Sequence, residues 1–242
     1  MENGSLPGIR HLAKRMEYIR ALMASIAIVF VIASSLTVNA QDSETQEIID
    51  KIEAMAKATG GYHADYVMVD SNQKTRRVTK GQMKQKWPYM RWAEIRRSKD
   101  DRLIGFSISN GVTRWNYLPK YKLALKRNAH GHEWIDKQSV RHVRTEFLGG
   151  EEVYVIEAQG SAGIPVDNLD FFGRTEFYIG TQDGIIRQAI IFNSKNKIKG
   201  TQIFFNIRPD PSISEEDFEF VPPQGTQIFD LDSEAQTTHI EK

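Results

Sequence analysis

The chain has 242 residues, of which 32 are basic and 31 acidic, for a formal net charge of +1. With 40% hydrophobic residues, it can form one ordinary globular domain with additional segments. The absence of cysteine excludes a disulfide scaffold, a thiol nucleophile, a cysteine-ligated metal site and a lipid anchor on an acylated cysteine.

Residues 1–40 predict a secretory signal peptide. A flank with four basic residues precedes an uncharged apolar run at 21–36, and Val38-Asn39-Ala40 resembles a cleavage site. A single-pass anchor is the alternative, but the run is shorter than the roughly 20 residues that span a bilayer. Either Met1 or Met16 is the start of translation.

Removal of this peptide changes the net charge of the chain, which bears on whether the protein binds nucleic acid. Residues 1–40 hold four basic and two acidic residues, so the net charge of +1 falls by two, to about −1. We therefore expect an exported protein that does not bind nucleic acid, because such binding depends on an excess of positive charge.

A period of 3.6 residues predicts an amphipathic helix after the signal peptide. Ser43-Glu44-Thr45-Gln46 matches a capping box, and Gly60-Gly61 marks the end of the helix. The opposite face mixes acidic and basic residues, so we expect the helix to pack on a sheet rather than on a membrane surface. The apolar face comprises Ile48, Ile49, Ile52, Met55 and Ala56.

From Tyr62 onward the period changes to 2, which is typical of strands. Short turns join most of these segments, so the sequence predicts an antiparallel sheet, rolled or sandwiched, with the helix on its concave side. Residues 232–242 are expected to form a frayed tail. About ten strands are predicted, with 75–87 and 89–95 as one strand that Pro88 interrupts; the others are 62–69, 103–109, 112–118, 121–125, 140–147, 151–158, 174–179, 185–192 and 199–207.

Asn110-Gly111 is the clearest hairpin signal, because both residues tolerate a positive φ. In the strand that follows, Arg114, Asn116 and Leu118 are expected on one face, with Trp115 and Tyr117 on the other. Large aromatic residues on one face call for an apolar partner, which is either a covering helix or a ligand.

No motif in the chain predicts catalysis. The sequence lacks HExxH, P-loop and GxSxG patterns. His130-Gly131-His132 has a spacing that can hold a metal, with Asp136 and His142 as further ligands, but a polar loop is the simpler interpretation. We therefore expect no metal, no cofactor and no catalytic residue, and keep a metal-dependent hydrolase as the remote alternative.

Other charged and apolar segments have structural interpretations. The acidic pair Glu151-Glu152 and the acidic run 215–217 are expected at a turn and a helix cap. Basic residues between Lys80 and Arg97 predict a basic edge on one strand pair. The long loop 159–173 carries enough apolar residues that we expect it to fold over something.

Several motifs, in this order, resemble the LolA family of periplasmic outer-membrane lipoprotein carriers, within a superfamily that includes LolB and RseB. Besides the leading helix and Gln182-Asp183-Gly184, they are Tyr62-His-Ala-Asp-Tyr66, Lys86-Trp-Pro-Tyr-Met-Arg-Trp92, Ser109-Asn-Gly-Val-Thr-Arg-Trp-Asn-Tyr-Leu-Pro119 and Asp217-Phe-Glu-Phe-Val-Pro-Pro-Gln-Gly225. The resemblance covers nearly the whole chain after residue 40.

The resemblance implies a mainly β (α+β) fold over residues 41–231: an incomplete antiparallel barrel around the N-terminal helix, with a hollow for acyl chains. The implied partners are lipoprotein or lipid acyl chains, an inner-membrane releasing complex and an outer-membrane acceptor. The alternative is an RseB-like module that senses a lipid or a partner. The cavity is expected to be lined by Trp92, Phe106, Trp115, Tyr117, Ile190 and Phe205.

One position departs from the family. The carrier has an arginine before the strand proline that hydrogen-bonds to its lid, whereas this chain has Trp87 there, with Arg91 nearby. The candidates for a lid or its latch are therefore Trp87, Arg91, Ile52 and Met55.

Overall fold

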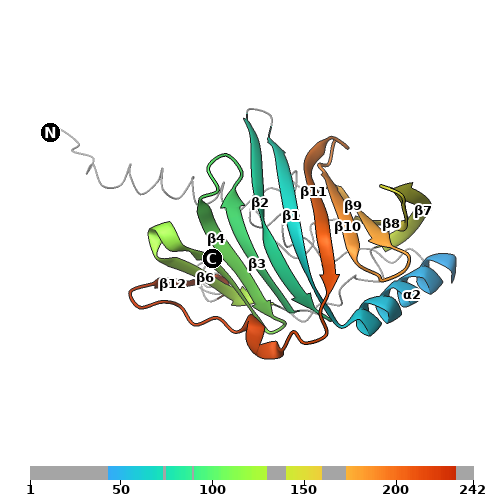
Figure 1. Ribbon diagram of the computed structural model, residues 1–242. Helices are drawn as coiled ribbons and strands as arrows, with labels where there is room; N and C mark the ends of the chain where they lie inside the picture. Colours follow the sequence, from blue (N-terminus) through green and yellow to red (C-terminus); the bar gives the residue numbers. More distant parts are fainter. Residues whose placement is uncertain (1–42, 73–74, 89, 130–139, 160–172, 233–242) are drawn as a thin grey trace, which may run out of the picture.

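The computed structural model describes residues 43–72, 75–88, 90–129, 140–159 and 173–232. Within these ranges, one α-helix precedes a single curved sheet of twelve strands (Figure 1). The predicted signal peptide, the His130-Gly131-His132 segment and most of the loop 159–173 lie outside them. No helix in the described part of the chain is long and apolar enough to span a membrane.

The elements follow the predicted order closely. The helix is α2 (Ser43–Thr59), and two short 3-10 helices, η2 (Pro119–Tyr121) and η4 (Glu215–Phe218), lie between strands. The strands are β1 (Gly61–Asn72), β2 (Thr75–Lys86), β3 (Met90–Arg97), β4 (Leu103–Asn110), β5 (Thr113–Leu118), β6 (Leu123–Asn128), β7 (Val140–Leu148), β8 (Glu151–Gln159), β9 (Arg174–Gly180), β10 (Ile186–Phe192), β11 (Ile198–Pro209) and β12 (Gln227–Asp230).

The strand order is β12-β6-β5-β4-β3-β2-β1-β11-β10-β9-β8-β7. Two antiparallel meanders, β1 to β6 and β7 to β11, are joined where β1 pairs with β11. The outermost strands are β12 and β7, so the sheet is open, and the predicted incomplete barrel is confirmed. Strand β12 was not predicted, and it pairs with β6 in parallel, so the expectation of a purely antiparallel sheet is wrong at this edge.

Helix α2 packs on one face of the sheet, which we call the inner face. Its buried residues Ile49 and Ile52 join the main core with Tyr66 of β1 and Ile179 of β9. Because alternate residues of a strand point to opposite faces, the register assigns every other strand residue to the inner or the outer face. On β3 to β6, the inner face carries a second, smaller core of Ile95, Leu118, Leu123 and Leu125.

The Asn110-Gly111 turn forms as predicted. The Asn110 side-chain oxygen accepts hydrogen bonds from the backbone N–H groups of Val112, at 3.1 Å, and Thr113, at 2.8 Å. Gly111 has a φ of +88°, a conformation that glycine adopts without strain. The predicted faces of β5 are confirmed, since Leu118 is in the smaller core while Trp115 points the other way.

The predicted basic edge is corrected by the strand order. Strands β2 and β3 lie in the interior of the sheet rather than at its edge. Their cations are divided between the two faces, and outer-face lysines form ion pairs, Lys80 with Asp101 at 3.0 Å and Lys84 with Asp217 at 2.5 Å.

Gly184, in the turn between β9 and β10, fixes the position of α2. A Cβ atom there would lie 2.6 Å from the Ile52 carbonyl oxygen and 2.9 Å from the Ala56 nitrogen. The Thr59 hydroxyl also donates a hydrogen bond of 3.2 Å to the Asp183 carbonyl oxygen. The helix and this turn are therefore in direct backbone contact.

Replacing Gly184 by alanine should lower the free energy of unfolding by about 3 kcal/mol, through backbone strain and a clash with α2. Gly149→Ala is the matched control, because Gly149 also has a positive φ, of +61°, but nothing within 4 Å of a Cβ atom. It should cost only the strain, about 1 kcal/mol. Equal losses in chemical denaturation would contradict the close approach of the turn to the helix.

Candidate functional site

The six predicted cavity residues all lie on the outer face, opposite α2. The register pairs Trp92 with Ile108, Ile108 with Trp115, and Phe106 with Tyr117, whereas the inner-face row beside them contains Ala93, Ser107 and Asn116. Ile190 belongs to a small outer cluster with Val153, Val155 and Tyr178, and Phe205 is 43% exposed. These residues were expected to line a hollow beneath the helix, but they lie on the opposite face of the sheet. Their contact with lipid stays a prediction.

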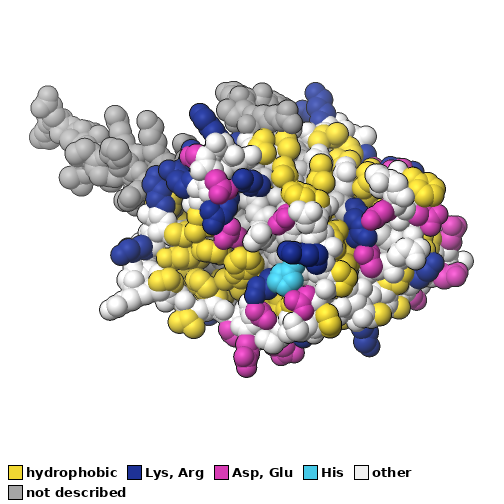
Figure 2. All heavy atoms as spheres, viewed as in Figure 1, with side chains coloured by type: hydrophobic (Ala, Val, Ile, Leu, Met, Phe, Trp, Pro, Cys, Tyr) yellow, Lys and Arg dark blue, Asp and Glu magenta, His cyan; other side chains and the backbone are white. Residues whose placement is uncertain are grey.

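The aromatic residues among them form an apolar surface over β3 to β5. The ring centroids of Trp92 and Phe106 are 5.9 Å apart, and Phe220 lies 5.5 Å from both Trp115 and Tyr117. Figure 2 shows hydrophobic side chains gathered over this half of the sheet. The outer aromatic residues are thus partly buried against one another and against the segment after η4.

Asp217 anchors that segment to the sheet. It pairs with Lys84 and accepts a hydrogen bond of 3.0 Å from the Ser214 backbone N–H. These two interactions hold the pKa of the Asp217 carboxyl below its usual range, and the interaction with Lys84 has the larger effect. The predicted role of the acidic run 215–217 as a cap is confirmed.

The four lid or latch candidates come together on the inner face. Ile52 has no exposed surface, and Met55 and Trp87 are partly buried against the main core. Arg91 lies across from Gln85 on β2, and one of its terminal nitrogens lies 3.5 Å from the Met83 sulfur. The structure groups these side chains, while their part in a lid stays a prediction.

Arg91 belongs to a row of arginines that crosses the inner face at right angles to the strands. Direct register partners connect Arg91 to Ser109, Ser109 to Arg114, and Arg114 to Arg127. We call Arg91, Arg114 and Arg127 the arginine row. Strands are spaced by about 4.8 Å, so the backbones of Arg114 and Arg127 are about 5 Å apart and those of Arg91 and Arg114 about 10 Å apart.

Burial lowers the pKa of all three arginines. The pKa of Arg114 is lowered to about 9, first by burial and then by the nearby charges of Arg127 and Arg91. Burial also lowers the pKa of Arg91, against the opposing effect of Tyr62 and Tyr66, and that of Arg127, against the opposing effect of Asp232. The row is therefore a cationic site within the fold, where like charges repel one another.

The arginine row adjoins polar and apolar surface. The next inner-face row contains Ser107 and Asn116, both buried, and the Ser107 hydroxyl donates a hydrogen bond of 2.7 Å to the Asn116 side-chain oxygen. The row after that contains Ile95 and Leu118 of the smaller core. The inner face thus changes from cationic to apolar within four residues along β3 and β5.

Sequence reasoning missed the arginine row as a unit. The hairpin at Asn110-Gly111 already implied that Arg114 shares a face with Asn116 and Leu118, but the aromatic face of β5 was taken as the interior. Arg127 had no signal of its own. Its place beside Arg114 depends on the connection between β5 and β6, where Lys122 adopts a left-handed conformation with a φ of +45°.

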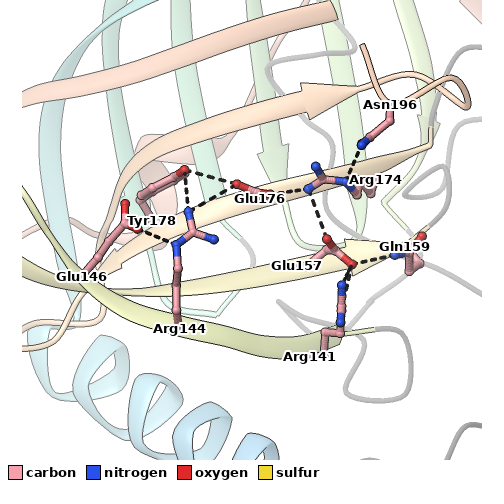
Figure 3. A network of polar contacts seen from close by, with 9 residues as sticks. All are labelled: Arg141, Arg144, Glu146, Glu157, Gln159, Arg174, Glu176, Tyr178 and Asn196. Atoms are coloured by element: carbon pink, nitrogen blue, oxygen red, sulfur yellow. Dashed lines mark hydrogen bonds and ion pairs between the residues drawn. The ribbon is translucent and has the colours of Figure 1, made fainter. Parts of the chain in front are cut away.

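A network of ion pairs covers the outer face of β7, β8 and β9 (Figure 3). Glu157 accepts hydrogen bonds from Arg141, at 2.9 Å, from Arg174, at 3.1 Å, and from Gln159, at 2.7 Å. Arg174 also pairs with Glu176. These side chains cross-link the three strands at this end of the sheet, so we interpret the network as structural.

The described part of the chain contains no group of three or more His, Asp or Glu residues that could hold a metal ion. His130, His132 and Asp136 of the predicted metal site lie outside it. His142 is described and packs edge-on against Tyr154, with ring centroids 6.0 Å apart. At the acidic turn, Glu151 pairs with Arg187 at 2.6 Å.

No protein-family model and no curated protein matches the chain. Among solved structures, an uncharacterised conserved protein from Thermus thermophilus is similar, with a TM-score of 0.53, 14% identity, and coverage of 76% of this chain and 98% of that one. A domain assigned to outer-membrane lipoprotein sorting in Vibrio parahaemolyticus has a TM-score of 0.44 and 13% identity, covering 73% and 96% of the two chains. A LolA superfamily protein from Nitrosomonas europaea has a TM-score of 0.40 and 9% identity, covering 73% and 97%. At these low identities, the similarity to the Thermus thermophilus structure concerns the fold alone.

Proposed function

We propose that this chain is an exported periplasmic carrier, which binds lipid or lipoprotein acyl chains on its inner face and passes them toward the outer membrane. The observation that supports this best is an open sheet whose inner apolar surface is divided. Helix α2 packs on the main core, whereas the smaller core on β3 to β6 is separate from it. A sheet that does not close can admit an apolar guest beside its helix.

Carriage of this kind needs no catalytic group. The cargo must leave the donor and reach the acceptor with little change in free energy at each step, because a carrier that binds too tightly cannot release it. An inner-membrane releasing complex and an outer-membrane acceptor are the partners that such a route requires.

Native mass spectrometry of the protein purified from its own cell envelope tests the proposal. A carrier should retain a bound species whose mass is lost on delipidation and identified as acylated by fragmentation. Delipidated protein offered the extracted lipid again should regain that mass. A protein that is purified without any bound species and takes up no acyl compound would contradict the proposal.

Trp115→Glu should leave acyl binding unchanged, because Trp115 is on the outer face, away from α2. The measurement is the affinity for a fluorescent fatty acid, with thermal unfolding to confirm that the variant folds. A folded variant that no longer binds would move the site to the outer aromatic surface and would contradict an inner-face site.

The second candidate is an interaction module that senses a lipid or a protein partner. It is favoured by the outer aromatic surface, which extends to Val221, next to Phe220 and 85% exposed. Transfer of a labelled lipid from donor to acceptor vesicles separates the two functions. A carrier accelerates the transfer in proportion to its concentration, and a sensing module does not.

A further inference from the structure

The arginine row suggests which part of a cargo the inner face recognises, beyond its acyl chains. Three guanidinium groups share one face of β3, β5 and β6, with Gln85 and Ser109 as neutral polar neighbours in the same row. Guanidinium groups are planar donors that match the oxygens of phosphates and carboxylates. A row of them in the interior of a small open sheet is an arrangement suited to an oxyanion.

The burial of the row strengthens this interpretation. The Nε atoms of Arg91 and Arg114 are shielded from solvent, and charge interactions are much stronger there than in water. Burying like charges side by side costs free energy that surface arginines do not cost. A bound anion would be attracted by all three charges, as the carboxylate of Asp232 is by Arg127 at one end of the row.

The surroundings of the row indicate that the anion is part of an amphiphile. Toward one end of β3 and β5, the inner face passes from the row to Ser107 and Asn116 and then to the smaller apolar core. Toward β1, the Tyr62 hydroxyl donates a hydrogen bond of 3.1 Å to Gln85, and Tyr62 itself belongs to the main core. An anionic head at the row would therefore have apolar surface on both sides for its acyl chains.

This inference rests on the proposed function. We propose that the arginine row of Arg91, Arg114 and Arg127 binds the anionic head group of an acylated cargo, and that this head group is a phosphate. The cargo class would then be an anionic phospholipid rather than an acyl anchor without charge. Phosphate is favoured over a single carboxylate because its oxygens can accept hydrogen bonds from more than one guanidinium group at once.

The test compares short-chain phosphatidylglycerol with the diacylglycerol of identical acyl chains, which lacks the phosphate, both below their critical micelle concentrations, by isothermal titration calorimetry. The wild-type protein should bind the anionic lipid at least about 10-fold more tightly, because the diacylglycerol has no phosphate oxygen to accept charge-assisted hydrogen bonds. A fatty acid of equal chain length and inorganic phosphate alone form the other arms. The phosphatidylglycerol should exceed both in affinity.

Arg114→Gln and Arg127→Gln should each reduce this preference about 10-fold, with little change in the affinity for the diacylglycerol. Arg96→Gln is the matched control: it lies on the same strand as Arg91, pairs with Glu94 and faces the outer side. It removes the same charge and should leave the preference unchanged. Circular dichroism and thermal unfolding show whether each variant folds.

The outcomes separate this inference from the proposed function. Equal affinities of the wild-type protein for the two lipids would overturn the role of the row, while leaving acyl carriage intact. A preference that survives in both row variants, or that Arg96→Gln removes equally, would also overturn it. Tighter binding of the fatty acid would keep the anion site but replace phosphate by carboxylate. If no acyl compound binds at all, the carrier function itself fails.

Discussion

Ile52→Ala should lower the free energy of unfolding by about 3 kcal/mol, among the largest effects of any single change in α2. The side chain has no exposed surface and packs in the main core between the helix and the sheet. Shortening it leaves a cavity, because backbone contact with the Gly184 turn prevents the helix from closing the gap. Urea denaturation followed by tryptophan fluorescence measures the loss.

Met55→Ala is the matched control, since Met55 is on the same helix but only partly buried against the core. It should cost about 1 kcal/mol. If both changes cost the same small amount, α2 would not be docked as the structure has it, and a lid that opens readily would be the better description. A large cost for Ile52 alone means that the helix is a fixed part of the core, and that any lid movement must leave Ile52 in place.

Glu157→Ala should also be strongly destabilising, by about 3 kcal/mol. The Glu157 side chain is only 4% exposed, and its removal leaves Arg174, which is 20% exposed, without one of its two carboxylate partners (Figure 3). Breaking a buried ion pair costs more than the pair contributes, because a desolvated charge remains.

Glu146→Ala provides the comparison within the same network. The Glu146 side chain is 34% exposed and its partner Arg144 is 41% exposed, so the loss should be below about 1 kcal/mol. The free energies of unfolding of both variants should be compared at low and high salt. A similar, salt-sensitive loss for both would mean that Glu157 behaves as a surface charge, contrary to its burial.

Local signals in the sequence were sufficient for the helix, most strands and the central hairpin, whereas the incomplete barrel was implied by the family resemblance. The capping box and Gly60-Gly61 gave the helix its bounds, with Gly60 at a φ of +75° and its N–H bonded to the Ala56 carbonyl oxygen at 3.1 Å. Alternation gave the strands, and the Asn110-Gly111 turn gave the register of the central hairpin. These features depend on neighbours within a few residues, which a single sequence contains.

The choice of the inner face depends on contacts far apart in the chain. Alternation divides Trp115 from Arg114 but does not say which of the two faces the helix. Aromatic size favoured Trp115, yet Phe220, more than 100 residues away, packs against it on the outer face. Strand β12 escaped prediction for a similar reason, because its four residues pair only with the distant β6.

Quenching by a brominated acyl chain tests most directly whether an apolar guest lies on the inner face. Single-tryptophan variants would retain Trp87, which is packed against the main core, or Trp92 or Trp115 on the outer face, with phenylalanine at the other tryptophan positions. With the guest on the inner face, a bound brominated lipid should quench Trp87 strongly and leave Trp92 and Trp115 nearly unchanged. Strong quenching of Trp92 or Trp115 with little change at Trp87 would contradict it and would place the guest on the outer aromatic surface.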